Sequence, residues 1–594
     1  MTSTSSTRVP DPSQPPSPAL AYGRGRGGVH RQVFWPALAI VLIIAIVAIF
    51  FPEATEETIG AIQTNVIGAF GWYYVLLVAA FVAFALWVGL GRWGDITLGD
   101  DDDRPDFSIG AWFAMLFAAG MGIGLVFYGV AEPLMHFASP KPGVIGTPER
   151  LAETAMAQTY LHWGVHAWAI YVVVGLAIAY AIHRKKRPVS IRWALEPLLG
   201  RRVEGKIGDA VDIAAVVGTI FGVATSLGLG VLQISAGLEH IGLIDSSAGV
   251  QIGIIVVITI LATASVVSGL DRGLKWLSNI NVSLAGLLLV ALLILGPTLF
   301  LLRDFVQSLG VYLANVLPMT FNVSAFSGAQ GEAWQAAWTT FYWGWWMSWA
   351  PFVGVFIARI SRGRTVREFV GGVLMVPTLI TFLWFSVLGG SAIHRELFGE
   401  GGLIPDDGAI SEENALFDLL GGLPWGAFLS VVAILLVTLF FITSSDSGSL
   451  VVAMLSTGGN PSPRIGVRVT WSVLEGLLAI ALLLAGGLVA LQTAAILIAL
   501  PFSVVMVAMA VAISKALHQE HQDFLRAQRR ELRARLTAHV TDRVTEHVTT
   551  MLDDYDDDRT ATQAEAPDTA PGDGPGTGVR GRLRRRRRSG NAEA

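Results

Sequence analysis

The sequence predicts an all-α polytopic membrane protein with twelve transmembrane helices. Of its 594 residues, 53% are hydrophobic and only 15% are charged, whereas a soluble chain of this length carries far more charge. The apolar residues gather in recurring runs of about 20, the length that a helix needs to cross a bilayer. Basic residues concentrate in alternate loops between these runs, as expected of a chain that crosses a membrane repeatedly.

Twelve apolar runs follow one another along the chain, and each one predicts a span. The first begins after a Ser-, Pro- and Gly-rich arm that ends in basic residues, and the last ends where the composition becomes strongly charged. The predicted spans cover residues 33–51, 68–91, 108–137, 155–183, 209–236, 250–268, 278–302, 335–360, 370–391, 425–455, 466–486 and 488–515.

The loop charges predict the orientation of these spans. The loops "HRKKRPVSIRW", "DRGLK" and "RISRGRTVR" follow spans four, six and eight and are basic, whereas "PEATEET" after span one is acidic. Cytoplasmic loops are enriched in Lys and Arg, so the even-numbered loops and both termini are predicted to be cytoplasmic. The acidic loop "LGDDDDRPD" after span two does not overturn this orientation, because acidic residues contribute little to the rule.

The two ends of the chain differ in composition from the predicted membrane part. Residues 1–32 predict a disordered cytoplasmic arm without a cleavable signal peptide. Residues 517–594 predict a cytoplasmic regulatory tail: an arginine-rich amphipathic helix, then a disordered linker that ends in the basic run Arg584–Arg588. Such a tail suits anionic membrane lipids or an acidic protein surface, and the alternative is a solvated tail that only helps to set the topology.

The stretch "FAAGMGIGLVFYG" places Gly120, Gly122 and Gly124 at alternate positions within the third span. Each glycine weakens a helix by about 1 kcal/mol relative to alanine. Three glycines at a spacing of two cannot all line one helix face, so the motif as a whole differs from the small-residue stripe of packed membrane helices. We therefore predict a broken span with exposed backbone groups, which is tolerated at membrane depth where it lines a cavity. The alternative is close helix packing.

Aromatic residues are concentrated in two spans. Residues 334–349 hold six of the eighteen tryptophans, and Trp346, Trp349 and Phe352 share one helix face. Span four adds Trp163, Trp168 and Tyr171. Two such faces could cage a quaternary ammonium by cation–π attraction, and the alternative is that the rings face lipid or fill the core.

Polar residues interrupt the tenth span in the stretch "FFITSSDSGS", residues 440–449. Thr443, Ser444 and Ser445 offer hard oxygens there, and Asp446 is an ionisable group at membrane depth. Hydroxyls together with unwound backbone could bind sodium. In the alternative interpretation, the hydroxyls bond back to carbonyls of their own helix.

Other chemistry is not indicated by the sequence. The chain has no cysteine, which excludes disulfides, thiol catalysis and cysteine metal sites. No phosphate-binding loop and no nucleophile–base pattern is present, so an enzyme, an organic cofactor and a nucleic-acid partner are not expected. His162 and His166 form an HxxxH pair on span four, but without a third ligand we expect polar packing. Glu132 and Pro133 are expected to mark a helix end or a gate.

Five segments together resemble the betaine/choline/carnitine transporter family, and most of all its sodium-coupled glycine betaine symporters. They are "AAGMGIGLVFYGVAEPL", "HWGVHAWAIYVVVGLAIAY", "GTIFGVATSLGLG", "FYWGWWMSWAPFVGVFIARISRGR" and "FFITSSDSGS", and the resemblance extends over residues 33–516. It implies a homotrimer in a bacterial inner membrane. Each chain would carry two peripheral helices (33–107), a five-helix repeat (108–302), an external connector (303–334) and a second, inverted five-helix repeat (335–516).

The resemblance also implies which residues bind substrate and ions. The trimethylammonium group of the substrate would lie among Trp163, Trp168, Tyr171, Trp346 and Trp349, with the backbone of Gly120, Gly122 and Gly124 beside its carboxylate. The first sodium site would use Ala118, Met121, Phe440, Thr443 and Ser444. A second sodium site would use Thr219 and Phe352, but Val223 stands where the family has another threonine, and a methyl group cannot replace a ligand oxygen.

The sequence thus predicts a transporter that imports glycine betaine, or a similar quaternary-ammonium compatible solute, by sodium symport under osmotic regulation. Two other functions stay open. One is a proton-coupled or exchange-type carrier of choline, carnitine or ectoine. The other is an osmosensory receptor that binds betaine without transporting it.

Overall fold

The structure is a computed structural model that describes residues 28–120, 122–268 and 271–564, without the side chains of residues 118–120, 268, 271–276 and 561–564. These residues are mainly helical, and the strand-like pairing among them is an isolated antiparallel bridge between Thr97 and Thr365. The predicted all-α class is therefore confirmed. The chain divides into two compact units, Met1–His521 and Gln522–Ala594.

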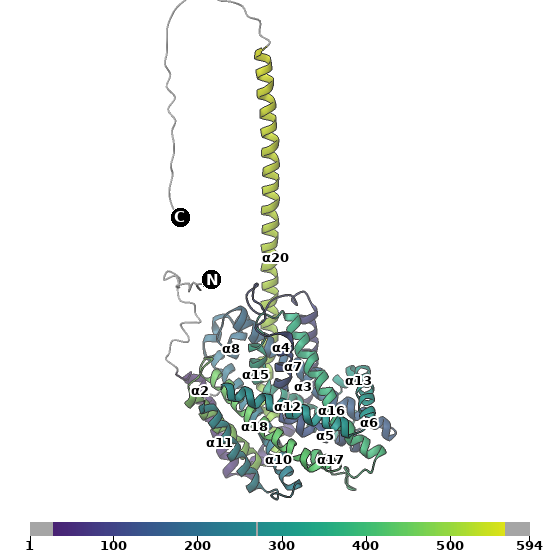
Figure 1. Cartoon of the computed structure of the whole chain (residues 1–594). Helices are drawn as coiled ribbons and strands as arrows, with labels where there is room; N and C mark the ends of the chain where they lie inside the picture. Colours follow the sequence, from purple (N-terminus) through teal and green to yellow (C-terminus); the bar gives the residue numbers. More distant parts are fainter. Residues whose placement is uncertain (1–27, 121, 269–270, 565–594) are drawn as a thin grey trace, which may run out of the picture. The chain divides into compact units, whose positions relative to one another are not determined.

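The helices of the first unit form a bundle in which most elements are long (Figure 1). Its first half contains α2 (Arg31–Phe50), α3 (Pro52–Leu90), α4 (Ile109–Gly120), α5 (Ile123–Ala138), α6 (Pro148–Trp163), α7 (Val165–Ala179), η1 (Tyr180–Arg184), α8 (Ile191–Ala194), α9 (Glu196–Leu199), η2 (Gly200–Glu204) and α10 (Lys206–His240). Its second half contains α11 (Ala248–Ser268), α12 (Asp271–Leu295), α13 (Thr298–Thr320), α14 (Gly328–Gln335), η3 (Ala336–Thr340), α15 (Phe341–Arg359), α16 (Val366–Phe398), α17 (Ala415–Gly421), α18 (Gly426–Ser456), α19 (Ile465–Leu484) and the start of α20 (Gly487–Ala564).

Ten helices among the described residues are long and apolar enough to cross a membrane, which fits a multi-pass protein. The predicted spans three and eight are not among them. Span three is divided between α4 and α5, and span eight contains five of the six tryptophans of residues 334–349, whose amphipathic rings lower its hydropathy. The count of twelve spans stays a prediction.

The fourth span is interrupted, where the sequence predicted one helix over 155–183. Helix α6 ends at Trp163 and α7 begins at Val165, with Gly164 between them at φ −95° and ψ −137°. A Cβ atom on Gly164 would lie 2.5 Å from the carbonyl oxygen of Tyr160 and 2.7 Å from the Phe382 ring, so only glycine fits this bend. Trp163 therefore ends one helix, whereas Trp168 and Tyr171 belong to the next.

The seventh span also ends earlier than its predicted range of 278–302. Helix α12 ends at Leu295, and after Gly296 and Pro297 a new helix, α13, occupies much of the segment expected to be a connector. Proline has no backbone N–H and disfavours helical backbone in the residue before it, so the Gly-Pro pair stops α12. The apolar run does not reveal this break, because residues 298–302 are themselves mostly apolar.

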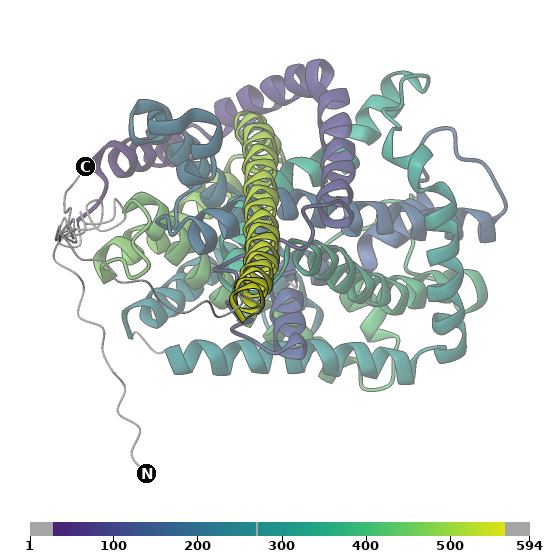
Figure 2. The ribbon, with the colours of Figure 1, turned by 90° about the horizontal axis from the view of Figure 1, so that it is seen from above.

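The centre of the first unit is formed by two helix pairs, α7 with α15 and α10 with α18, within the bundle that Figure 2 shows from above. All of α7 from His166 onward is buried, as is α10 between Ala215 and Val231. Small residues allow the close approach: a Cβ atom on Gly222 of α10 would lie 3.1 Å from the backbone nitrogen of Trp349 in α15. In the buried centre, the aromatic helix α15 therefore packs against both α7 and α10.

In the second unit, residues 522–564 are helical and belong to α20. Apolar side chains recur along this helix at helical spacing and are exposed: Phe524, Leu532, Leu536, Val540, Val544, Val548 and Leu552. The predicted binding of this helix to lipid or protein stays a prediction. Most of the predicted N-terminal arm and the basic run Arg584–Arg588 lie outside the described residues.

Candidate functional site

The third span is broken in the place that its glycines predicted. Helix α4 ends at Gly120 and α5 begins at Ile123, and Gly122 between them has extended backbone (φ −130°, ψ 179°). A Cβ atom on Gly122 would lie 2.9 Å from Cη2 of Trp349. On Gly124, it would lie 2.4 Å from Cη2 of Trp345. These glycines therefore let the tryptophans of α15 approach the broken backbone.

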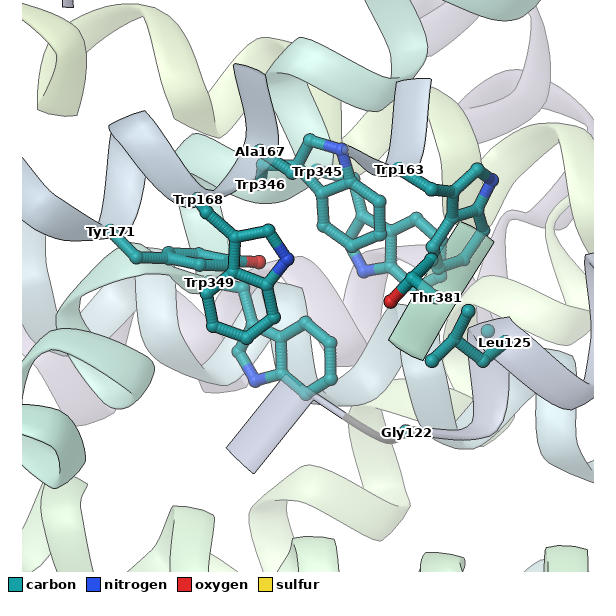
Figure 3. Close-up of a pocket in the computed structure, with 11 residues that line it drawn as sticks. Gly122, Leu125, Trp163, Ala167, Trp168, Tyr171, Trp345, Trp346, Trp349 and Thr381 are labelled. Atoms are coloured by element: carbon teal, nitrogen blue, oxygen red, sulfur yellow. The ribbon is translucent and has the colours of Figure 1, made fainter. Parts of the chain in front are cut away.

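A pocket, here called the aromatic pocket, lies beside this break (Figure 3). Five helices contribute to it, namely α5, α6, α7, α15 and α16, together with Gly122 in the break before α5. It is lined by Gly122, Gly124, Leu125, Trp163, Ala167, Trp168, Tyr171, Trp345, Trp346, Trp349 and Thr381. All five aromatic residues predicted to bind substrate thus line one cavity, together with Gly122 and Gly124. Gly120 is not among the lining residues.

The rings of the aromatic pocket stand at steep angles to one another. The Trp163 and Trp346 rings are 4.9 Å apart with an interplanar angle of 69°, and those of Trp168 and Tyr171 are 5.4 Å apart at 76°. Rings at such angles present several π faces to a common space, which suits a cation that contacts more than one ring.

Trp345 and Thr381 are pocket residues that the sequence reasoning missed. Trp345 stacks on Trp349 with the rings 6.1 Å apart and nearly parallel, at 3°. The two residues are four apart in α15, so their shared face could have been found from helical spacing. Thr381 belongs to α16, and its position in the pocket depends on packing between distant helices, for which the sequence carries no local signal.

Hydrogen bonds hold two of these indoles and leave two others without a partner. The Nε1–H of Trp346 donates to the His162 carbonyl at 3.0 Å, and that of Trp163 donates to Oε2 of Glu132 at 2.6 Å. The buried Nε1–H groups of Trp345 and Trp349 have no hydrogen-bond partner among the described residues. A buried donor without an acceptor is costly, so these two groups favour a ligand that carries an acceptor.

Glu132 and Pro133 lie inside α5 and not at its end, so the expected helix end is wrong; the Glu132 carboxylate instead holds Trp163 in the wall of the aromatic pocket. This buried carboxylate accepts from Trp163 and from the Tyr342 hydroxyl on one oxygen, and His162 Nδ1 lies 2.6 Å from the other. His136 Nε2 lies 3.3 Å from that second oxygen. A buried carboxylate is stabilised by this number of donors, which in turn fix the rings that carry them.

The two histidines of the HxxxH sequence, His162 and His166, have different hydrogen-bond partners. His166 Nε2 bonds to Thr320 Oγ1 at 2.8 Å, whereas His162 joins Glu132 and His136 in a group whose ligand atoms lie within 4.8 Å of one another. Metal ligation by this group would compete with the protein donors that already occupy both carboxylate oxygens. The expected polar packing is therefore the interpretation that the contacts favour.

A second cavity adjoins Trp349 and is lined by most of the predicted ion ligands; we call it the hydroxyl cavity. It is lined by Ser278, Asn281, Val282, Trp349, Phe352, Val353, Phe356, Phe440, Thr443, Ser444 and Ser447. Trp349 lines both cavities, so its side chain is shared by them. Of the other residues predicted for the first sodium site, Met121 lies outside the described residues and the side chain of Ala118 is not described.

The polar groups of the hydroxyl cavity are partly engaged with their own helices. Thr443 Oγ1 donates to the carbonyls of Leu439 at 2.8 Å and Phe440 at 3.2 Å, the back-bonding considered from the sequence. Its oxygen lone pairs can still accept a cation. Asn281 was missed by the sequence reasoning: it is buried, and its Oδ1 lacks a hydrogen-bond partner within the described part of the chain.

The residues predicted for a second sodium site are not brought into one cavity. Phe352 lines the hydroxyl cavity, but Thr219 does not, and its hydroxyl donates to the Ala215 carbonyl at 2.7 Å. Asp446, the intramembrane acid of the same stretch as Thr443, is held by Ser265 at 2.7 Å and Arg468 at 2.9 Å. Asp446 is thus part of an ion pair and does not line the hydroxyl cavity.

Comparisons with known proteins place these features in one family. The model of the betaine/carnitine/choline family transporters matches residues 32–522. An uncharacterized transporter of Mycobacterium tuberculosis is 53% identical over 496 residues, which cover 82% of this chain and 83% of that protein. The glycine betaine transporter OpuD of Bacillus subtilis is 43% identical over 499 residues, covering 84% and 96%. The glycine betaine transporter 1 of Vibrio parahaemolyticus is 42% identical over 501 residues, covering 83% and 95%.

A solved structure of a Na⁺-coupled sialic acid symporter, in its substrate-bound outward-open state, shows a weaker likeness. It matches with 15% sequence identity and a TM-score of 0.39, covering 73% of this chain and 85% of that chain. A likeness at this level carries no argument about substrate or ion.

Proposed function

Because this chain belongs to the betaine/carnitine/choline transporter family, we propose that it imports glycine betaine, or a similar quaternary-ammonium compatible solute, by sodium symport. It is a multi-pass membrane transporter and not an enzyme. The observation that carries the choice of substrate is the aromatic pocket beside the break between α4 and α5.

The aromatic pocket matches the chemistry of a betaine at both ends of the molecule. A trimethylammonium group has no N–H to donate, so it is best held by ring faces, at about 2 kcal/mol or more where water is excluded. The rings of Trp163, Trp168, Tyr171 and Trp346 offer such faces. The carboxylate of betaine could accept from unpartnered indole N–H groups of the pocket and from backbone freed at Gly122.

The hydroxyl cavity supports sodium as the coupling ion. Sodium prefers oxygen ligands, and Thr443 and Ser444 bring two hydroxyls to this cavity, with Phe440 contributing backbone there. The shared ring of Trp349 offers a direct route by which an ion in one cavity could affect a substrate in the other. Backbone carbonyls of Ala118 and Met121 would complete the site, and the separation of Thr219 from Phe352 favours a single sodium ion.

The remaining features of the proposal concern the assembly and its regulation. Alternating access would come from one five-helix repeat rocking against the other around the aromatic pocket. The transporter would be a homotrimer in a bacterial inner membrane with both termini cytoplasmic, and its basic tail would bind anionic lipids and confer osmotic activation. Deleting residues 517–594 should then abolish the activation of uptake by osmotic upshift without abolishing uptake.

The experiment that tests the proposal is uptake of labelled glycine betaine into proteoliposomes, with and without an inward sodium gradient. Choline, which lacks the carboxylate, runs as the parallel substrate. We expect accumulation of betaine that requires sodium. Accumulation that ignores sodium would reject symport, preferential choline uptake would reject betaine as substrate, and binding without accumulation would identify a receptor.

A further inference from the structure

Glu475 is a carboxylic acid at the centre of α19 that belongs to neither cavity. Its side chain is 0% exposed, and α19 is long and apolar enough to cross a membrane. An ionised carboxylate without compensating partners is costly at such a position, and intramembrane ionisable groups are functional candidates by default.

The two oxygens of Glu475 have unequal surroundings. Oε2 accepts a hydrogen bond from the Ser445 hydroxyl at 3.0 Å, whereas Oε1 has no hydrogen-bond partner among the residues described. A Cβ atom on Gly448 would lie 3.3 Å from Oε1 and 3.0 Å from Cγ2 of Val223, so this oxygen and this methyl group flank the same small space. An ionised carboxylate normally collects several donors, and Glu475 has one.

The helices that pack against α19 offer Glu475 little positive charge. These helices are α2, α10, α11 and α18. Helix α11 contains no ionisable residue, and α2 carries only Arg31, at its first position. The ionisable residues of α10 lie in its first two turns (Lys206, Asp209 and Asp212) and its last turn (Glu239 and His240).

The nearby charges are Asp446 of α18 and Arg468 of α19 itself. Arg468 Nη2 donates to Oδ1 of Asp446 at 2.9 Å, so the guanidinium is engaged by the other carboxylate. Within the described side chains, Glu475 forms no ion pair, and the nearby Asp446 adds repulsion if Glu475 is charged. A protonated, neutral Glu475 avoids both the desolvation cost and this repulsion.

We propose that Glu475 is a proton-binding site of the transporter, neutral in this conformation, whose proton is released and regained during the transport cycle. The step is a simple protonation: water delivers a proton to the carboxylate and accepts it back. The link to transport is α18, because Ser445 follows Thr443 and Ser444, which line the hydroxyl cavity. A shift of α18 as that cavity fills or empties moves the Ser445 hydroxyl relative to Glu475. The coupling to transport rests on the proposed function, whereas the proton site itself does not.

Infrared difference spectroscopy on the purified full-length protein tests the proton site without requiring transport. Wild-type protein at neutral pH should show the carbonyl band of a buried protonated carboxyl group, and Glu475→Gln should lose it. Glu239→Gln, which removes an exposed acid at the end of α10, should keep the band. Ser445→Ala retains the carboxyl group and should shift the band frequency, which covers the case in which Glu475→Gln fails to fold. A wild-type spectrum without a band that responds to these substitutions would overturn the proposal.

Uptake of glycine betaine across a pH series tests the coupling. As the pH is raised, wild-type uptake should fall when Glu475 loses its proton. In Glu475→Gln this pH dependence should be lost, while Glu239→Gln keeps it. A pH profile that is unchanged in Glu475→Gln would overturn the coupling. Wild-type vesicles that never accumulate betaine would instead reject the proposed function, and the infrared result would still decide the proton site.

Discussion

Trp346 offers the sharpest test of the aromatic pocket, because replacing it with leucine removes one ring face and keeps an apolar side chain. The Trp346 ring is buried, and its centroid lies 4.9 Å from that of Trp163 and 6.4 Å from that of Tyr171. All three rings line the aromatic pocket. The indole N–H of Trp346 bonds to a backbone carbonyl, so the ring is held in place before any ligand binds.

The expected effect follows from the loss of one desolvated cation–π contact. Such a contact is worth about 2 kcal/mol, which corresponds to about a 30-fold increase in the dissociation constant of glycine betaine. Trp346→Phe keeps a ring face of weaker potential and should lose less than Trp346→Leu. The neutral analogue 3,3-dimethylbutanoate replaces the ammonium nitrogen by carbon, so its binding should respond little to Trp346→Leu.

Binding is measured by calorimetry on the purified protein in detergent, with Trp343→Leu as the matched control. Trp343 lies in the same helix and is equally buried, but it stacks on His166 and does not line the aromatic pocket. Both variants lose comparable packing, and only Trp346→Leu should lose affinity. Equal affinities in wild type and Trp346→Leu, or an equal loss in Trp343→Leu, would refute the cation–π reasoning.

Three further predictions concern the surroundings of the two cavities. Gly124→Ala should weaken betaine binding about tenfold, because its methyl group would meet the Trp345 ring at 2.4 Å; unchanged binding would show that the ring can move freely. Glu132→Gln should destabilise the protein by about 3 kcal/mol, because an amide nitrogen cannot accept the hydrogen bonds that Trp163 and Tyr342 donate to the carboxylate. An unchanged thermal midpoint in detergent would contradict this. Thr443→Ala should raise the sodium concentration for half-maximal uptake about tenfold, whereas Thr438→Ala, which removes a back-bonded hydroxyl outside the hydroxyl cavity, should leave it unchanged; equal effects would remove Thr443 from the ion site.

The parts of the site that could be predicted from the sequence depend on local chemistry. Three glycines at alternate positions weaken a helix wherever the helix packs, so the break beside Gly122 could be expected from the residues alone. Two tryptophans three apart, such as Trp346 and Trp349, share a helix face in any fold, and both line the aromatic pocket.

The parts that could not be predicted depend on how helices are rotated and bent against one another. The role of Glu132 could not be predicted, because nothing near it in the sequence shows that Tyr342, 210 residues later, donates a hydrogen bond to its carboxylate. Thr219 carried the expected residue type, but the rotation of α10 leaves its hydroxyl on its own helix and outside the hydroxyl cavity.

The sequence by itself determined the membrane class, the family and the break in the third span. Apolar run length, loop charge and glycine spacing are properties of single segments. Their effect on whether a segment spans the membrane or breaks depends on water, lipid and local backbone geometry, and not on contacts with distant segments. Tertiary structure decided which side chains share a cavity, as it did for Trp345 and Asn281, and where a span bends, as it did at Gly164. These outcomes depend on the rotation of each helix about its axis, which many weak contacts with distant segments set together.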